Sequence, residues 1–309
     1  MWFNNALIYQ YELDNSEELL NCLKDERLKP CPAHARFTFG WVPAVTDELV
    51  YEITGTSLIC LGKEERILPK SVINRYLAEK IQTLEAERGF PVKRAEKGQL
   101  AEDIEFDLLP KAFCLQKRLP AIVDSISKRL IINSSSSTQA SQLIALLRKS
   151  IPGIKLEPVN TESNLAVLFT SWIKNPASLP KNIDLAANCL LFSADNEKKQ
   201  FNCKGYELPA DEVDSLLSQG LVAAEVELVW NERIQFTLTQ DLVFKRLKCL
   251  DYLVDEFHEA NKLDIDNNSH HDAELTLLSG ELRSLFDFLI PQITNKKTKQ
   301  DNFEAITAI

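Results

Sequence analysis

The sequence predicts an α+β fold with mixed, mostly antiparallel sheets and flanking helices. Three observations predict it. Residues 5–13 (NALIYQYEL) alternate apolar and polar side chains as a strand does, and residues 48–68 form two such runs around Gly55-Thr56, a hairpin signal. Residues 221–253 alternate over a span long enough for two or three antiparallel strands. Strand and helix patterns follow one another without the regular βα period of a parallel sheet.

The clearest helix is expected over residues 69–91, after Pro69, with Ser71 as a cap and Gly89 at its end. Its apolar face comprises Ile73, Leu77, Ile81 and Leu84. Further helices are expected over 16–28 (capped by Ser16), 139–153, 209–220, 251–262 and 272–293. Residues 121–133 predict a strand or strand pair, residues 188–194 a strand, and residues 195–205 a hairpin tip. Two segments stay open: 165–173 fits a helix or a strand, and 90–104 fits an exposed turn or a short helix.

The chain is expected to form one unit over residues 1–295, followed by a flexible polar tail over 296–309. Segments 69–110 and 195–220 are candidates for projections from its body. No apolar run reaches the length of a membrane helix, so we expect no membrane partner. The first residues read as a strand and not as a signal peptide.

Charge is distributed unevenly along the 309 residues, whose formal net charge is −10. Residues 111–155 carry eight cations and one acid, whereas residues 251–287 carry ten acids and two cations. A chain with this dipolar pattern can offer a phosphate-binding face while its other face stays anionic. Chance clustering on a solvated surface is the alternative explanation, and a helix-dipole role explains Arg148 and Lys149 equally well.

Catalytic and metal chemistry find little support in the sequence. It contains no P-loop, no G-x-G-x-x-G and no G-x-S-x-G. The segment His270-His271-Asp272 is the best metal candidate, but adjacent histidines on a polar loop are expected to point apart into solvent. The acid pairs Glu64-Glu65 and Asp255-Glu256 would suit a magnesium-dependent nuclease, although surface acids are commoner. We therefore predict no enzymatic activity, no cofactor and no metal.

The seven cysteines are scattered, and no two stand at C-x-x-C spacing. This usage predicts reduced thiols in a cytoplasmic protein, with each cysteine a small buried apolar residue.

Nine short stretches, taken together and in order, resemble the bacterial recombination-associated protein RdgC family over residues 1 to about 290. They are GWVP (40–43), KEERILPKSVI (63–73), LEAE (84–87), LLPKAF (108–113), ALLRKS (145–150), KKQ (198–200), RIQF (233–236), FKRLKCLD (244–251) and SGELRSLFDFLI (279–290).

The resemblance implies a homodimer of two horseshoe-shaped subunits that meet at both ends to form a ring. Duplex DNA is expected to pass through the basic hole of this ring without sequence preference; binding of single strands stays open. The resemblance further implies a protein that limits RecA-dependent strand exchange by occupying DNA, and hence a cytoplasmic, nucleoid-associated protein without catalysis or cofactor.

Three residues match dimer contacts of the family. Phe113 matches a phenylalanine at one contact; its alternative is a place in the core. Lys199 and Gln200 match a Lys-Gln pair near the second contact; their alternative is a solvated hairpin tip.

Binding without sequence preference requires cations for phosphates and no side chains that read bases. The first candidates are Lys111, Lys117, Arg118, Lys128 and Arg129. The second group, Lys93, Arg94 and Lys97, is expected on a projecting basic finger. The third is Lys245, Arg246 and Lys248, although strand alternation would send Lys245 and Arg246 to opposite faces.

One alternative is a regulator that acts mainly by protein contact. Its acidic region, 251–287, would bind RecA or another recombination protein, and DNA binding would be secondary.

Overall fold

The computed structural model describes residues 2–13, 19–45, 47–161, 163–193, 196–206, 208–251, 253, 255 and 267–294. Its strands are β1 Asn5–Glu12, β2 Phe37–Trp41, β3 Val50–Ile53, β4 Thr56–Arg66, β5 Cys114–Asp124, β6 Arg129–Ile132, β7 Lys155–Pro158, β8 Ile183–Ser193, β9 Asn196–Lys204, β10 Leu221–Trp230, β11 Ile234–Thr239 and β12 Phe244–Cys249. Its α-helices are α1 Leu19–Lys24, α2 Lys70–Arg88, α3 Arg94–Leu108, α4 Ser137–Ser150, α5 Leu165–Lys174, α6 Asp211–Ser218 and α8 Asn267–Thr294. Short 3₁₀ turns are η1 Leu109–Lys111 and η2 Pro176–Ser178.

The strands form one 12-stranded sheet in the order β2-β4-β5-β6-β1-β12-β11-β10-β8-β9, with β3 also on β4 and β7 also on β1. Strand β1 joins its two halves, because Asn5 and Ala6 pair with β12 while residues 7–10 pair with β6. The α+β class with large antiparallel pairing and flanking helices is confirmed. The mixed sheet is not found: the named strands of the described chain pair antiparallel throughout.

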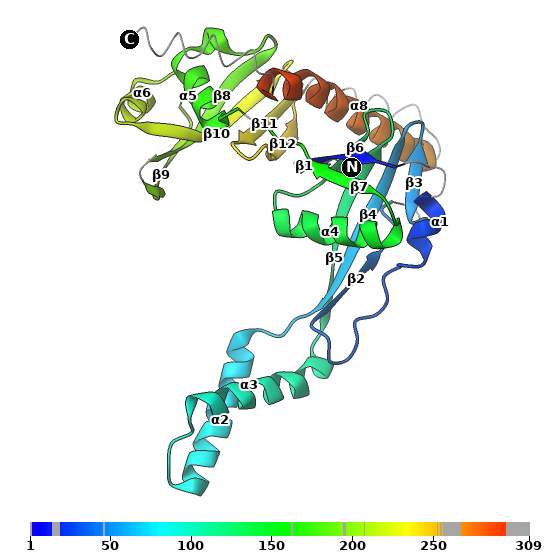
Figure 1. Ribbon diagram of the computed structural model, residues 1–309, viewed down its shortest axis with the longest axis vertical. Coiled ribbons are helices and arrows are strands. Elements are labelled where there is room, and N and C mark those ends of the chain that lie inside the picture. Colours follow the sequence, from blue (N-terminus) through cyan, green and yellow to red (C-terminus); the bar gives the residue numbers. More distant parts are fainter. Residues whose placement is uncertain are drawn as a thin grey trace.

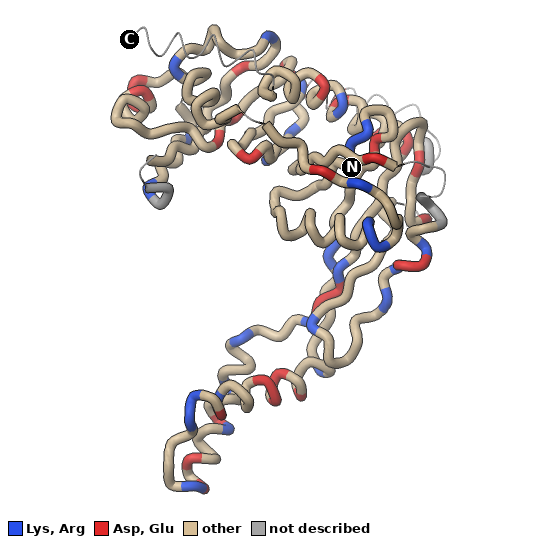
Figure 2. Tube along the Cα trace, in the orientation of Figure 1, with Lys and Arg blue, Asp and Glu red and all other residues tan. Residues whose placement is uncertain are grey.

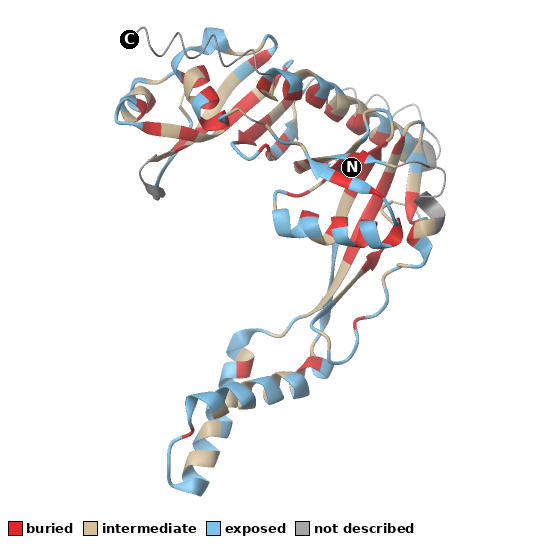
Figure 3. Cartoon of the chain, in the orientation of Figure 1, coloured by how far each residue is buried: buried red, intermediate tan, exposed pale blue. Residues whose placement is uncertain are grey.

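Two apolar cores lie on the two faces of the β4–β5–β6 region (Figure 3). Ile59 and Ala121 belong to the core that contains α4, whereas Leu58 and Ile122 belong to the core that contains α8. Alternation along each strand sends neighbours to opposite faces, so both faces must be covered. The α8 core continues over β10, β11 and β12, so this helix holds the two halves of the sheet together.

Strands β4 and β5 extend beyond both cores as a long ribbon that ends in α2 and α3 (Figure 1). The helix expected over 69–91 is confirmed, and Gly89 ends it with a φ of 73°. Ser71 does not cap it; Pro69 occupies that position. Of the expected apolar face only Ile73 is buried, because α2 packs against little besides α3.

Several other segments differ from expectation. Residues 165–173 form helix α5, since the side chain of Asn164 accepts hydrogen bonds from the first free N–H groups. Residues 90–104 lie mostly in the 15-residue helix α3, and the polar 195–205 segment contains strand β9. Ser16, all of 256–262 and the tail over 296–309 lie outside the described residues. Within the described ranges, no helix combines the length and the apolar character needed to cross a bilayer.

Candidate nucleic-acid interface

The cations of η1 and β5 stand on an exposed part of the ribbon. Lys111 is exposed and makes no ion pair within the described residues. Lys117 and Arg118 point to opposite faces of β5, as neighbours on a strand must. The Nζ of Lys117 lies 2.6 Å from Glu65 Oε1, while Arg118 donates to the carbonyl of Ala44 at 3.3 Å.

Glu65 is shared by two lysines. Besides Lys117 it pairs with Lys63 of its own strand, and the register places these two lysines directly opposite each other. Hydrogen bonds from Lys117 and then Lys63 lower the pKa of Glu65, although partial burial opposes them. Two cations on one carboxylate leave a net positive charge on this face.

The turn between β5 and β6 separates two candidates that are adjacent in sequence. Lys128 is exposed, with φ 55°, and its Nζ lies 5.8 Å from the ring centroid of Tyr11. Arg129 is directed inward, where it pairs with Asp287 of α8 and keeps only 13% of its side chain exposed. The charge of Arg129 is therefore engaged within the chain.

The basic residues of the α2–α3 pair are confined to the start of α3. Lys93, Arg94 and Lys97 are exposed at the start of α3 and make no ion pair with any residue that the structure describes. The later turns of α3 are acidic, with Glu102, Asp103, Glu105 and Asp107. Figure 2 accordingly shows both signs of charge along these helices, so only one end of α3 offers a basic surface.

The cations of β12 do not obey the expected alternation. Lys245 pairs with Glu225 at 2.6 Å, and Arg246 approaches the same carboxylate at 3.4 Å. The prediction of opposite faces is wrong because a bulge interrupts the β11–β12 register here and Arg246 adopts φ 55°. Lys248 is exposed and has no ion pair among the described residues.

The residues matched to dimer contacts lie on two separate parts of the molecule: Phe113 precedes β5, whereas Lys199 and Gln200 belong to β9, which Figure 1 shows on the opposite arm. Phe113 follows η1 where the ribbon meets α3, and its 85% exposure excludes a place in the core. Lys199 and Gln200 are exposed on β9, beside Phe201, which is 44% exposed. Exposed aromatic side chains of this kind are typical of surfaces that contact a partner.

Of the two acid pairs, the structure describes both members only of Glu64-Glu65, and these two carboxylates do not converge on one site. Glu64 and Glu65 are neighbours on β4 and point to opposite faces; Glu64 accepts the N–H of Cys31 at 2.8 Å. Asp255 is exposed, and its neighbour Glu256 lies outside the described residues.

The two adjacent histidines lie on helix α8 and not on a solvated loop, so that expectation is wrong. Their Nδ1 atoms lie 3.9 Å (His270) and 3.7 Å (His271) from Glu274 Oε2. Within the part of the chain that the structure describes, this is the one group of three side chains whose ligand atoms, all within 4.8 Å of one another, can hold a metal ion. The sequence analysis missed this group because it expected the helix to begin at residue 272, after the histidines, whereas α8 begins at Asn267.

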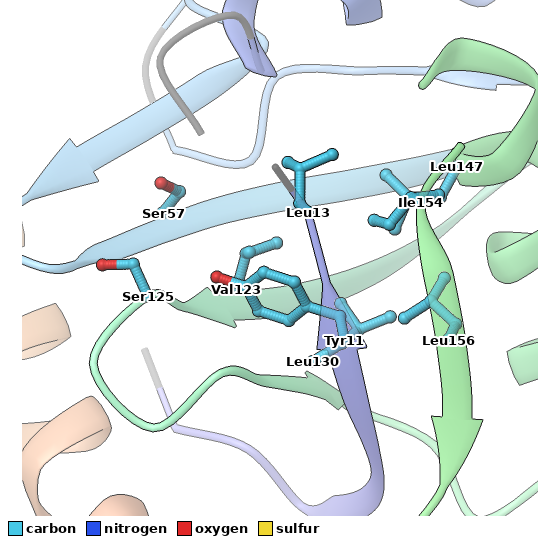
Figure 4. A pocket seen from close by; sticks show the side chains of 9 residues that line it. All are labelled: Tyr11, Leu13, Ser57, Val123, Ser125, Leu130, Leu147, Ile154 and Leu156. Atoms are coloured by element: carbon cyan, nitrogen blue, oxygen red, sulfur yellow. The ribbon is translucent and has the colours of Figure 1, made fainter. Parts of the chain in front are cut away.

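Figure 4 shows a cavity lined by nine residues, Tyr11 and Leu130 among them. Its volume of about 30 Å³ is too small for a substrate. Two larger hollows, of about 250 and 300 Å³, adjoin cations: one is lined by Lys63 and Lys117, the other by Lys128. The first of these hollows therefore adjoins two lysines, whereas the second combines Lys128 and Lys155 with Glu12 and Glu157.

All seven cysteines are free, and four are buried as expected. The expectation is wrong for Cys114, which is exposed because β5 has left the core at that point.

Comparison with known proteins decides the family. The RdgC profile, described as "Putative exonuclease, RdgC", matches residues 1–296. The chain belongs to the RdgC family. The "Recombination-associated protein RdgC" of Pseudoalteromonas translucida (strain TAC 125) is 35% identical over 295 residues, which cover 94% of this chain and 96% of the relative. The proteins of the same name from Salmonella newport (strain SL254) and Salmonella typhimurium (strain LT2) are each 30% identical over 296 residues, with 94% of this chain and 97% of the relative covered.

The resemblance carried by the nine stretches is thus confirmed, and the chain is a recombination-associated protein of the RdgC family. The profile's description names an exonuclease, whereas the names of these curated relatives contain no enzymatic activity.

Proposed function

We propose that this RdgC-family protein binds DNA without sequence preference, as a ring-shaped homodimer that encircles duplex DNA and limits RecA-dependent strand exchange by occupying the DNA. The observation that carries the proposal is a set of exposed cations without an ion-pair partner among the described residues, in a chain of net charge −10. They are Lys93, Arg94, Lys97, Lys111, Arg118, Lys128 and Lys248. Such side chains neutralise phosphates and release counterions whatever the base sequence.

Two separate exposed contacts support a ring. Phe113 precedes β5 on one arm, and Lys199 with Gln200 lies on β9 of the other (Figure 1), so a two-fold dimer can use both. Each subunit would then act as a horseshoe with its cations toward the enclosed DNA. Enclosure retards escape, so modest affinity for each phosphate suffices.

The candidates are not equivalent. Arg129 and Lys245 are partly buried in ion pairs with Asp287 and Glu225, so their removal would disturb the fold. Lys117 and Arg246 are more than half exposed but share carboxylates, so we expect weaker phosphate contacts from them.

The double variant Lys111→Ala/Lys128→Ala is expected to bind random-sequence duplex more weakly, with a shallower salt dependence. Each lost phosphate contact reduces the slope of log affinity against log salt by about 0.9. Fluorescence anisotropy across a salt series measures both quantities. The matched control is Arg75→Ala/Lys149→Ala, which removes equal charge from side chains that face Glu79 and Glu26.

Native protein without affinity for duplex at low salt would contradict the proposal. Equal slopes for the test and control variants would show that Lys111 and Lys128 do not face DNA.

Regulation by direct protein contact is the second candidate, although three described carboxylates of the acidic region 251–287 already have partners. Within the acidic region, Asp272 accepts from Tyr51 at 2.7 Å, Glu281 pairs with Arg233 at 2.6 Å, and Asp287 pairs with Arg129. These carboxylates already have partners inside the chain. Inhibition of strand exchange that persists in a variant unable to bind DNA would favour this candidate.

We infer no nuclease activity that uses Glu64 and Glu65, since these two carboxylates cannot converge on one metal ion. Magnesium-dependent loss of a labelled duplex, abolished by Glu64→Gln/Glu65→Gln, would overturn this inference.

A further inference from the structure

The outer part of the β2–β4–β5 sheet presents a mixed aromatic and basic surface. The register places Phe37 opposite Glu65 and Phe39 opposite Lys63. It also places Lys63 opposite Lys117, so all of these side chains share one face. Nearer the body the same face is covered by α4; Phe39 still packs at the edge of that core, whereas Phe37, Lys63 and Lys117 do not belong to it. We call these five residues the ribbon platform.

The ring of Phe37 is open, and that of Phe39 beside it is partly buried against the α4 core. Phe37 is 49% exposed, and its ring centroid lies 5.2 Å from that of Phe39, with the planes tilted by 57°. The Nζ of Lys63 lies 5.0 Å from the Phe37 centroid and 6.0 Å from that of Phe39. Pairing with Glu65 on the same face fixes the lysine, so the outer face of Phe37 is presented in a defined orientation.

A hollow of about 250 Å³ adjoins the platform. Phe39, Lys63 and Lys117 line one side of it, and polar side chains at the start of α4, including Thr138 and Gln142, line the other. The volume of this hollow lies below the roughly 300–1,000 Å³ of sites that hold drug-sized ligands. The hollow therefore suits one flat base better than a larger molecule.

We propose that the ribbon platform binds unpaired nucleotides of single-stranded DNA, with a base stacked on Phe37 and adjacent phosphates near Lys63 and Lys117. Aromatic side chains interleaved with cations on an open sheet are the combination that holds single strands without sequence preference. Duplex DNA keeps its base faces stacked, so only unpaired DNA can use the rings. A contact with a second protein copy is less favoured, because lysine is depleted in the centre of protein interfaces.

This inference rests on the proposed DNA binding and specifies a second class of DNA for one part of the surface. The two surfaces would then have different roles. The exposed cations bind the phosphates of duplex DNA, and the ribbon platform adds affinity for DNA wherever its strands are separated.

The test compares native protein, Phe37→Ala and Phe37→Trp for binding to an oligothymidine and to a random duplex, by anisotropy at fixed salt. Phe37→Ala should weaken oligothymidine binding about tenfold, the loss of one stacked base, and leave duplex binding unchanged. Phe37→Trp should restore the affinity, and its added fluorescence should be quenched by oligothymidine. Phe90→Ala is the matched control, since Phe90 is 58% exposed at the end of α2, away from the platform.

The inference is overturned if Phe37→Ala binds oligothymidine as tightly as native protein, or if it weakens both DNAs equally. A shift of Phe37→Ala toward monomer in sedimentation would also overturn it, by assigning the ring to a contact between copies. Native protein that does not bind duplex DNA would instead contradict the proposed function. Failure of the proposed function is thus distinguishable from failure of the single-strand inference.

Discussion

Replacing Arg283 by alanine is expected to lower the free energy of unfolding by about 3–5 kcal/mol, the cost of leaving a buried charge without its partner. Arg283 of α8 donates to Asp124 from Nε at 2.8 Å and from Nη2 at 3.0 Å, and also reaches Thr56 at 3.3 Å. Asp124 is 1% exposed. This pair joins α8 to β4 and β5 at their buried end, where Thr56 pairs with Asp124, so its loss weakens the contact between the two halves of the sheet. Urea unfolding at one protein concentration measures the change.

The control for this prediction is Lys155→Ala, which breaks an ion pair whose side chains are 73% and 76% exposed. Exposed pairs contribute about 0–1 kcal/mol, so this variant should unfold close to the native midpoint. A similar small effect for Arg283→Ala would show that the buried pair does not stabilise the fold.

Acidification provides a second expected result for the same pair. Burial alone would raise the pKa of Asp124, but hydrogen bonds from Arg283, Ser127 and the N–H of Ile126 lower it below its ordinary 3.8. A carboxyl with a lowered folded pKa contributes stability that is present above 3.8 and is lost as pH falls through the folded pKa. The difference between native protein and Arg283→Ala should therefore shrink below about pH 4. A difference that stays constant or grows on acidification would contradict this assignment.

Replacing Phe113 by alanine is expected to weaken the proposed dimer without destabilising the subunit. With 85% of Phe113 exposed, the subunit has little packing to lose, so its unfolding free energy should change by about 0.5 kcal/mol or less. An aromatic anchor of an interface typically contributes about 2 kcal/mol or more, which corresponds to a roughly 30-fold rise in the dimer dissociation constant. Sedimentation across a concentration series measures that constant.

Phe90→Ala serves as the control, because Phe90 is 58% exposed and lies outside the proposed contacts. Equal sedimentation of native protein and Phe113→Ala would remove Phe113 from the dimer contact. Duplex binding by Phe113→Ala should also become more sensitive to salt challenge, since an open ring no longer retains DNA.

The sequence predicted most elements of this fold because their patterns are local. Alternation predicted β1 and the region of β10, β11 and β12. Gly89 marked the end of α2, and Gly55 marked the turn of the β3–β4 hairpin. Helix α3 was harder, since none of its residues is buried and no apolar stripe reveals it. The apolar segment 165–173 fits a helix or a strand by its sequence pattern, and the N-cap at Asn164 explains why it forms helix α5.

The candidate interface was less predictable, because the state of a cation depends on residues distant in sequence. Nothing near Arg129 indicates that Asp287 neutralises it, and nothing near Lys117 indicates Glu65. The bulge that turns Arg246 toward Glu225 has no signal in its own segment. The ribbon platform was missed because Phe37 and Lys63 come together only through strand register.

The most direct test of the central claim, encirclement, is retention on circular DNA. Protein is loaded on a bead-bound, nicked circular plasmid and washed with salt high enough to remove phosphate contacts. The amount of protein that stays bound is measured before and after a single cut linearises the plasmid. A closed ring predicts that protein survives the wash on the circle and leaves once the circle is cut. Release at the same salt concentration from circular and linear DNA would contradict encirclement.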